Sequence, residues 1–176
     1  LVLRENGITE PILVIGRVAP QFVQVAVDYN ITLAVFQFEW IKQALDLGIN
    51  GTLTIHLEFE TGFNRTGIRS KESLRKIVHA VQASNGKINI TGAYTHFATA
   101  DEINSEHYRR QKTVYEEMLQ ELTNLYAEPI VTHIGNSAAG IQYPKEMRQF
   151  TRFGISLYGL YPSWKIKQLN KVELKP

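Results

Sequence analysis

The stretch "HLEFETGFNRTGIR", residues 56–69, ends an apolar segment with two carboxylates and then carries an arginine in a loop flanked by glycines. The segment that it completes, "LTIHLEF" (53–59), has the branched and aromatic residues of a buried strand. A guanidinium such as that of Arg65 suits planar recognition of an anionic oxygen, which makes the loop a candidate anion site. Pairing of Arg65 with Glu58 or Glu60 at the end of the sheet is an equally good interpretation.

Similar apolar segments recur along the chain, and helical patterns lie between most of them. The predicted strands are 11–16, 31–36, 53–59, 88–97, 130–135 and 153–160. The predicted helices are 20–29, 38–47, 71–84, 104–126 and a short one at 137–143. This alternation predicts an α/β fold with a parallel sheet, and the pattern alone does not separate an open sheet from a barrel.

Polar side chains gather where the predicted strands end. They are Glu58, Glu60, His96, His133, Asn136 and Ser137. Parallel α/β folds carry their chemistry at this edge of the sheet, so we expect a functional site there.

The composition narrows the class of protein. The chain has 176 residues, 44% of them hydrophobic and 20% charged, as in ordinary globular domains with one sizeable core. A net charge of +2 argues against nucleic acid or a membrane surface as partner, and the absence of cysteine fits a cytoplasmic protein. The first residues, "LVLRENGIT", have the pattern of the last turns of a helix, so we expect a piece of a longer polypeptide.

His96 follows an apolar strand in "GAYTHFATADE" and has three interpretations: metal ligand, general acid–base group, or hydrogen-bonding brace. A metal-dependent barrel hydrolase would need His56 and His133 as further ligands at the same edge. No HxH or HExxH spacing supports that interpretation, and a lone strand histidine is more often a packed, hydrogen-bonded residue. We therefore expect no metal site.

Two later stretches, "HIGNSAAG" and "TRFGISLYGL", place small residues beside polar ones. Backbone N–H groups and the Ser137 hydroxyl at a helix start can bind a phosphate, although N-capping by Asn136 or Ser137 explains the same pattern. In the second stretch Arg152 begins the predicted strand, and Gly154 allows another group to approach the backbone closely. The chain has no GxSxG, GxGxxG or P-loop motif, so neither a serine hydrolase nor a nucleotide site is predicted.

Together these stretches resemble the alanine racemase family, whose members bind pyridoxal 5'-phosphate (PLP) in an N-terminal (β/α)8 barrel. "ETGFNRTGIR", "THFATADE", "HIGNSAAG" and "RFGISLYGLYPS" match family motifs, in family order, over nearly the whole chain. The resemblance implies an incomplete parallel (β/α) barrel, from about the third strand to the eighth, over residues 1–170. Residues 171–176 would be the start of a C-terminal β domain.

The resemblance also implies roles around the PLP ring. Arg65 would hydrogen-bond the phenolic oxygen of PLP and help to hold the substrate carboxylate, while Arg152 would face the pyridine nitrogen. His96 would brace that second arginine. Because arginine keeps its proton, the pyridine nitrogen would stay unprotonated, which limits carbanion lifetime and favours racemisation over transamination.

The PLP phosphate would bind the Ser137 hydroxyl and the backbone amides of Gly154 and Ile155, with Asn136 in a supporting position. Phosphate sites of barrels lie late in the strand order, as these residues do. The hypothesis requires both arginines and the serine to share one rim, and it fails if they lie on different sides of the molecule, away from any common hollow.

The chain departs from the family in two ways. Glu58 stands where the family commonly has a carboxylated lysine, and we expect its carboxylate to orient Arg65, while Glu60 replaces the usual aspartate. In the family the PLP lysine belongs to the first barrel strand, which this chain lacks, and a second base, a tyrosine, comes from the C-terminal domain of the partner subunit. Racemisation needs a base on each face of the substrate, so we expect this chain alone to be inactive.

The resemblance implies that the full-length enzyme interconverts L- and D-alanine by two-base proton transfer and supplies D-alanine for peptidoglycan. We expect a cytoplasmic homodimer that binds neither nucleic acid nor membranes. The alternatives are a non-catalytic PLP-binding homeostasis protein, a racemase for another amino acid such as serine or lysine, and the metal-dependent hydrolase.

Overall fold

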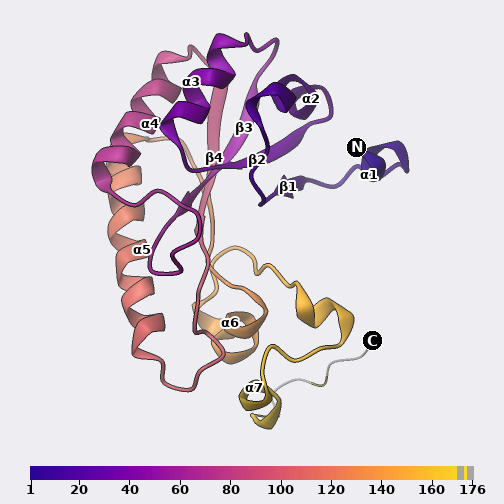
Figure 1. Cartoon of the computed structure of the whole chain (residues 1–176), viewed down its shortest axis with the longest axis vertical. Coiled ribbons are helices and arrows are strands. Elements are labelled where there is room, and N and C mark those ends of the chain that lie inside the picture. Colours follow the sequence, from indigo (N-terminus) through magenta and orange to yellow (C-terminus); the bar gives the residue numbers. More distant parts are fainter. Residues whose placement is uncertain (170–172, 174–176) are drawn as a thin grey trace.

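The computed structural model describes residues 1–169 and residue 173, and its sheet has five parallel strands in the order β1-β2-β3-β4-β5. The strands are β1 (Ile12–Val14), β2 (Ile31–Val35), β3 (Leu53–Phe59), β4 (Ile88–Thr95) and β5 (Val131–His133). Figure 1 shows a strongly twisted sheet with long helices along one side. The predicted α/β fold with a parallel sheet is confirmed, as are five of the six predicted strands.

Helices follow the strands largely as the sequence patterns predict. They are α1 (Val2–Glu5), α2 (Val23–Asp28), α3 (Phe38–Asp46), α4 (Lys71–Ala83), α5 (Glu106–Leu125), α6 (Ser137–Gln142) and α7 (Trp164–Gln168), with 3₁₀ turns η1 (Pro20–Phe22), η2 (Pro144–Glu146) and η3 (Ile155–Tyr158). The Ser70 hydroxyl caps α4 by accepting a hydrogen bond from the N–H of Ser73. The predictions do not include α7, although Ser163, which caps it, is a sequence signal for its start.

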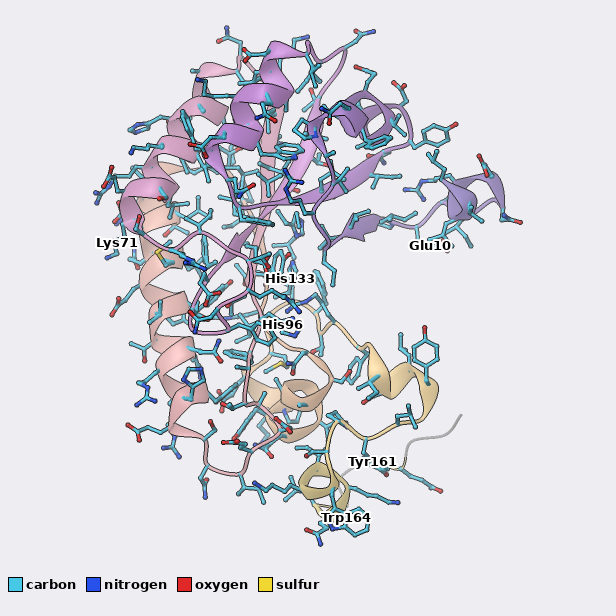
Figure 2. All side chains as sticks on the ribbon, in the orientation of Figure 1. Glu10, Lys71, His96, His133, Tyr161 and Trp164 are labelled. Atoms are coloured by element: carbon cyan, nitrogen blue, oxygen red, sulfur yellow. The ribbon has the colours of Figure 1, made fainter. Side chains whose placement is uncertain are left out.

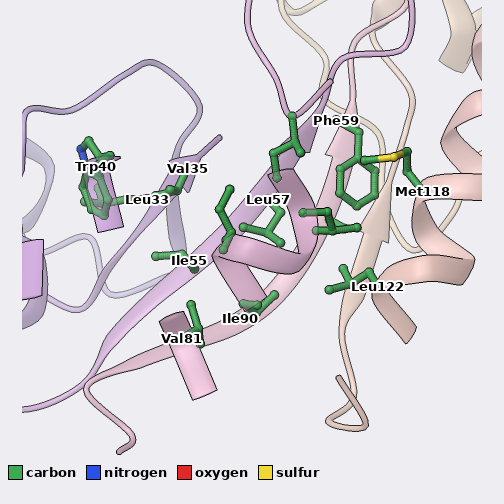
Figure 3. Packing of buried hydrophobic residues seen from close by; sticks show 14 of the residues in the cluster. Leu33, Val35, Trp40, Ile55, Leu57, Phe59, Val81, Ile90, Met118 and Leu122 are labelled. Atoms are coloured by element: carbon green, nitrogen blue, oxygen red, sulfur yellow. The ribbon is translucent and has the colours of Figure 1, made fainter. Parts of the chain in front are cut away.

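The core lies between the sheet and helices α3, α4 and α5 (Figure 1). Residues from strands and helices that meet there include Leu33, Val35, Trp40, Ile55, Leu57, Phe59, Val81, Ile90, Met118 and Leu122 (Figure 3). Each of these ten side chains is at most 5% exposed. Because side chains alternate along a strand, the residues between the core positions of β3 face the opposite side of the sheet.

The predicted sixth strand, 153–160, is wrong. Its backbone closes on itself in η3, where the N–H of Gly159 donates to the carbonyl of Ser156 at 3.3 Å. Gly159 has φ +74, the left-handed conformation that ends such a turn. In the described residues a single bridge, between Gly135 and Thr151, continues the sheet beyond β5. An apolar run without a neighbouring strand to pair with has folded into local turns.

The two ends of the chain complete this description. At the start, α1 stops before Gly7, which has φ +80, as the sequence predicts for a helix end. The predicted start of a β domain, 171–176, lies outside the described residues except for position 173. Among the described residues, no helix has the length and apolar character needed to span a membrane.

Candidate active site

The face of the sheet opposite the core carries ionisable side chains. The strand register pairs Glu58 of β3 with Tyr94 of β4, and Tyr94 with His133 of β5, so these side chains lie side by side. His56 lies two residues before Glu58, on the same face. A Cβ atom at Gly92, opposite His56, would come within 2.5 Å of the imidazole ring, so glycine leaves the space for that ring.

Arg152 is held beside this row by three hydrogen bonds. Its Nη1 donates to His133 Nδ1 (2.7 Å) and to the His133 carbonyl (2.9 Å), and its Nη2 donates to the Thr95 carbonyl (2.7 Å). The guanidinium carbon lies 4.9 Å from the centre of the Tyr94 ring. The prediction that His96 braces this arginine is wrong, because the bonded histidine is His133. Figure 2 shows both histidines in the middle of the molecule.

The chemistry of arginine fixes where two histidines carry their protons. A guanidinium only donates, so His133 Nδ1 accepts and the proton of that ring sits on Nε2. This Nε2–H donates to His56 Nδ1 across 2.9 Å. Burial, together with the Arg152 charge, lowers the pKa of His133 to about 2 and that of His56 to about 4, so both rings are neutral. Burial also lowers the pKa of Arg152, to about 10, which leaves it charged at neutral pH.

One cavity, of about 430 Å³, lies next to Arg152. Its walls include six of the predicted site residues: His96, Asn136, Ser137, Arg152, Gly154 and Ile155. The Nε atom of Arg152 is buried and has no hydrogen-bond partner among the described residues. An unpaired buried donor is costly, and an acceptor on a bound molecule would satisfy it.

The sequence left open whether Asn136 and Ser137 cap a helix or bind an anion, and the structure gives the two residues different contacts. Asn136 caps α6, because its side-chain oxygen accepts from the N–H of Ala139 at 3.0 Å. Its amide also donates to the Phe97 carbonyl at 3.1 Å. The Ser137 hydroxyl does not cap the helix and instead accepts from the N–H of Gly154 at 2.9 Å. Both residues belong to the cavity wall, and the Ser137 hydroxyl, which accepts from Gly154, keeps its own proton to donate to an anion.

Arg65 does not line this cavity. Its guanidinium carbon lies 4.5 Å from the centre of the Phe63 ring, and that ring packs edge-on against His96, with 5.1 Å between ring centres. Phe63 lines the cavity, whereas Arg65 is exposed and lines a neighbouring depression. The structure therefore brings Ser137 and Arg152 to one hollow and leaves Arg65 stacked on Phe63 beside it.

The two carboxylates at the end of β3 have different environments. Glu60 accepts hydrogen bonds from the backbone N–H groups of Gly62 (2.5 Å) and Arg65 (3.1 Å), so it fixes the loop. Glu58 is 3% exposed, and its Oε2 has no hydrogen-bond partner among the described residues. Burial raises the pKa of Glu58, while the charges of Arg65 and Arg152 lower it. Nothing in the described part of the chain bonds Glu58 to Arg65, so its orienting role stays a prediction.

The histidines show no arrangement for a metal ion. His56 and His133 use facing ring nitrogens to bond each other. Within residues 1–169 and 173, no three histidine, cysteine, aspartate or glutamate side chains are grouped to hold a metal. Among the site residues that were not predicted are Tyr94, whose signal was its position two residues before His96, and Phe63, which had none.

Comparison with known proteins extends this picture. A family model described as alanine racemase, N-terminal domain, matches residues 1–162. The chain belongs to the alanine racemase family. Alanine racemase 2 of Bacillus subtilis is 41% identical over 180 residues, which cover 100% of this chain and 45% of that protein. The chain thus spans less than half the length of the curated alanine racemases that it matches.

Solved racemase structures share the fold. The crystal structure of alanine racemase from Bacillus anthracis with bound L-Ala-P aligns with a TM-score of 0.93 at 35% identity, covering 99% of this chain and 45% of that one. Histidine racemase from Leuconostoc mesenteroides aligns with a TM-score of 0.77 at 30% identity, again covering 99% and 45%. The curled sheet is therefore part of the barrel of the alanine racemase family, and the predicted incomplete barrel is confirmed with five strands.

Proposed function

We propose that this chain is the cofactor-binding part of a PLP-dependent alanine racemase, which interconverts L- and D-alanine. Membership of the alanine racemase family supports the reaction class. The observation that carries the proposal for the site is the buried, unpaired Nε–H of Arg152, a residue of the cavity wall. A pyridine nitrogen without a proton is an acceptor of the kind that this donor lacks.

The residues around the cavity fit PLP. A volume of about 430 Å³ lies in the usual range of small-molecule sites. Arg152 would hold the pyridine nitrogen, and Ser137 with the amides of Gly154 and Ile155 would hold the phosphate. The Ser137 hydroxyl and the Gly154 N–H are already 2.9 Å apart. Bound PLP supplies an electron sink for the electron pair that remains when the substrate loses its α-proton.

The chain's own residues then limit how strong that sink is. Arg152 keeps its charge and its protons at neutral pH, so it places a donor at the ring nitrogen without protonating it. The neutral His133 ring accepts from the guanidinium and donates in turn to His56, which holds the guanidinium in one orientation. A weaker sink shortens the life of the carbanion, which favours fast proton return over side reactions. Arg65 would orient the substrate carboxylate, with His96 near it.

The two bases of the reaction would come from outside this chain. The family places its lysine on the first barrel strand and its tyrosine on a partner subunit, so we expect a homodimer and no racemisation by this chain alone. Exposed Leu157 (70%), Tyr158 (77%) and Trp164 (67%) support a protein interface on that side of the molecule. The product, D-alanine, would serve peptidoglycan synthesis in the cytoplasm.

A second candidate function is racemisation of another amino acid. The likeness to a histidine racemase at 30% identity favours it. Arg65, Ser137 and Arg152 would contact groups that PLP and every amino acid share, so they would not select a side chain.

The test uses the full-length protein that contains this chain. We expect it to hold PLP, seen in its visible absorbance, and to convert L-alanine faster than L-serine, L-lysine or L-histidine. Faster turnover of one of those three would favour the second candidate. PLP binding without any racemisation would identify the non-catalytic alternative, and a protein that binds no PLP would overturn the proposal.

A further inference from the structure

Gln111 of α5 is a buried amide that joins two loops of the site. The pairing of β3 with β4 ends where these loops begin. Gln111 is 0% exposed, and its Oε1 accepts from the N–H of Ala98 at 2.9 Å. Its Nε2 donates to the His96 carbonyl (3.1 Å) and to the Thr61 hydroxyl (3.1 Å). Beyond the last paired residues of β3 and β4, the Gln111 side chain therefore connects the loops that follow the two strands.

A directed chain of hydroxyl groups continues from this amide. The Thr95 hydroxyl donates to the Phe59 carbonyl at 2.9 Å, so its oxygen accepts from the Thr61 hydroxyl, 2.7 Å away. A hydroxyl has one proton, so Thr61 in turn needs a donor, and Gln111 is that donor. The carbonyl of Thr95 accepts from Arg152 Nη2 at 2.7 Å. The network thus runs from α5 to the arginine of the cavity.

One turn before Gln111, α5 makes a second contact with the loop that follows β3. His107 lies four residues earlier, and its Nε2 is 3.0 Å from the Gly62 carbonyl. A carbonyl only accepts, so His107 carries its proton on Nε2. Gly62 has φ +135, and a Cβ atom there would lie 3.0 Å from the His107 ring and 3.2 Å from Gln111 Cγ. The loop that carries Phe63 and Arg65 is therefore packed directly on α5.

We infer that Gln111 is a positioning residue: its amide sets the spacing between the loop of Phe63 and Arg65 and the loop of His96. The inference deepens the proposed function and rests on it, because Arg65 and His96 are the groups expected near the substrate. The position requires an amide, since one acceptor and two donors are used by one side chain. Glutamate has the same shape but, when ionised, offers no donor and carries a charge, so Gln111→Glu removes both donated hydrogen bonds and places a charge among their acceptors.

The first measurement is steady-state kinetics of the full-length protein. Gln111→Glu misplaces Arg65 and His96, so we expect KM for L-alanine to rise about tenfold, as for the loss of one or two buried hydrogen bonds. We expect kcat to change less than KM. We expect PLP affinity to fall by less than KM rises, because Ser137, Arg152 and Gly154 lie on other elements and only Arg65 belongs to the displaced loop. Gln120→Glu, the same chemical change at an exposed position of α5, is the matched control and leaves all three values unchanged.

The second measurement does not depend on activity. Trypsin cuts after exposed Arg65 only when the loop leaves its place, so Gln111→Glu is expected to speed this cleavage about tenfold, with no change in Gln120→Glu. Thr61→Val breaks the next link of the same network without adding a charge. It keeps the test decisive if Gln111→Glu does not fold, and it is expected to raise both KM and the cleavage rate.

These outcomes distinguish a failure of the proposed function from a failure of the role inferred for Gln111. An unmodified protein that neither binds PLP nor racemises would overturn the proposed function, while the cleavage rates would still report on the loop. An active protein in which Gln111→Glu or Thr61→Val folds and keeps both KM and the cleavage rate would overturn the role of Gln111. Equal losses of kcat and PLP affinity with unchanged KM would also overturn it.

Discussion

Glu58 and Glu60 stand two residues apart at one strand end, yet their oxygens meet different partners. Glu60 accepts from two backbone N–H groups of the loop that follows, so it acts on the backbone and not on a guanidinium. Glu58 keeps one buried oxygen unpaired beside two arginine charges. Arg152 shows the reverse, with an unpaired buried donor. At the scale of single residues, Arg152 is the one of these two whose unpaired atom belongs to a residue of the cavity wall.

Arg152 gives the first prediction at this scale. In Arg152→Lys one ammonium cannot reach both His133 and Thr95, so charge-assisted hydrogen bonds are lost in a buried place. We expect the free energy of unfolding, measured with urea, to fall by about 2 kcal/mol and PLP binding to weaken. Arg75→Lys, which alters an exposed ion pair with Glu121, is the control and should change stability by less than about 1 kcal/mol. Equal stability of the two variants would contradict the anchoring role of Arg152.

At the scale of elements, local signals predicted most helices and most strands, although not α7. Periodic apolar residues and the Ser70 cap place α4 within a residue or two of its predicted bounds. The segment 153–160 has the composition of a strand, but whether a strand forms depends on a neighbour to pair with, which is not a local property. The histidine that meets Arg152 was wrongly predicted for the same reason. It depends on the register of β5 beside β4, which the sequence near His96 does not contain.

Gly92 gives a prediction about how β3 and β4 fit together. A Cβ atom there would come within 2.5 Å of the His56 ring, and that ring is fixed by its bond to His133. We expect Gly92→Ala to lower the free energy of unfolding by about 1–3 kcal/mol in urea titrations. Gly16→Ala is the control, because a Cβ atom at that position meets nothing within 4 Å. If Gly92→Ala is as stable as Gly16→Ala, the close packing of His56 on this strand is wrong.

At the scale of the whole molecule, the charged Arg152 guanidinium and the neutral rings of three histidines lie near the face of the sheet opposite the core. Burial first, and then the Arg152 charge, lowers the pKa of His56 and of His96 to about 4 and that of His133 to about 2. The unfolded chain takes up protons on these rings near pH 6.5, well before the folded one does. Stability is therefore expected to fall as the pH is lowered from about 6.5 toward 4, by up to about 1.4 kcal/mol per pH unit for each histidine.

Glu58 acts in the opposite direction, because its raised pKa lets the folded state bind a proton before the unfolded one. One carboxyl does not outweigh three histidines, so the net loss in acid remains. Urea titrations at pH 7.5, 6.5, 5.5 and 4.5 measure this loss. His56→Gln should reduce the slope of the free energy of unfolding against pH, because it removes one titrating ring. His79→Gln, at an exposed position of α4, should leave the slope unchanged. A protein as stable at pH 4.5 as at pH 7.5 would mean that the folded state accepts these protons, and hence that His133 and His56 are not the neutral rings described above.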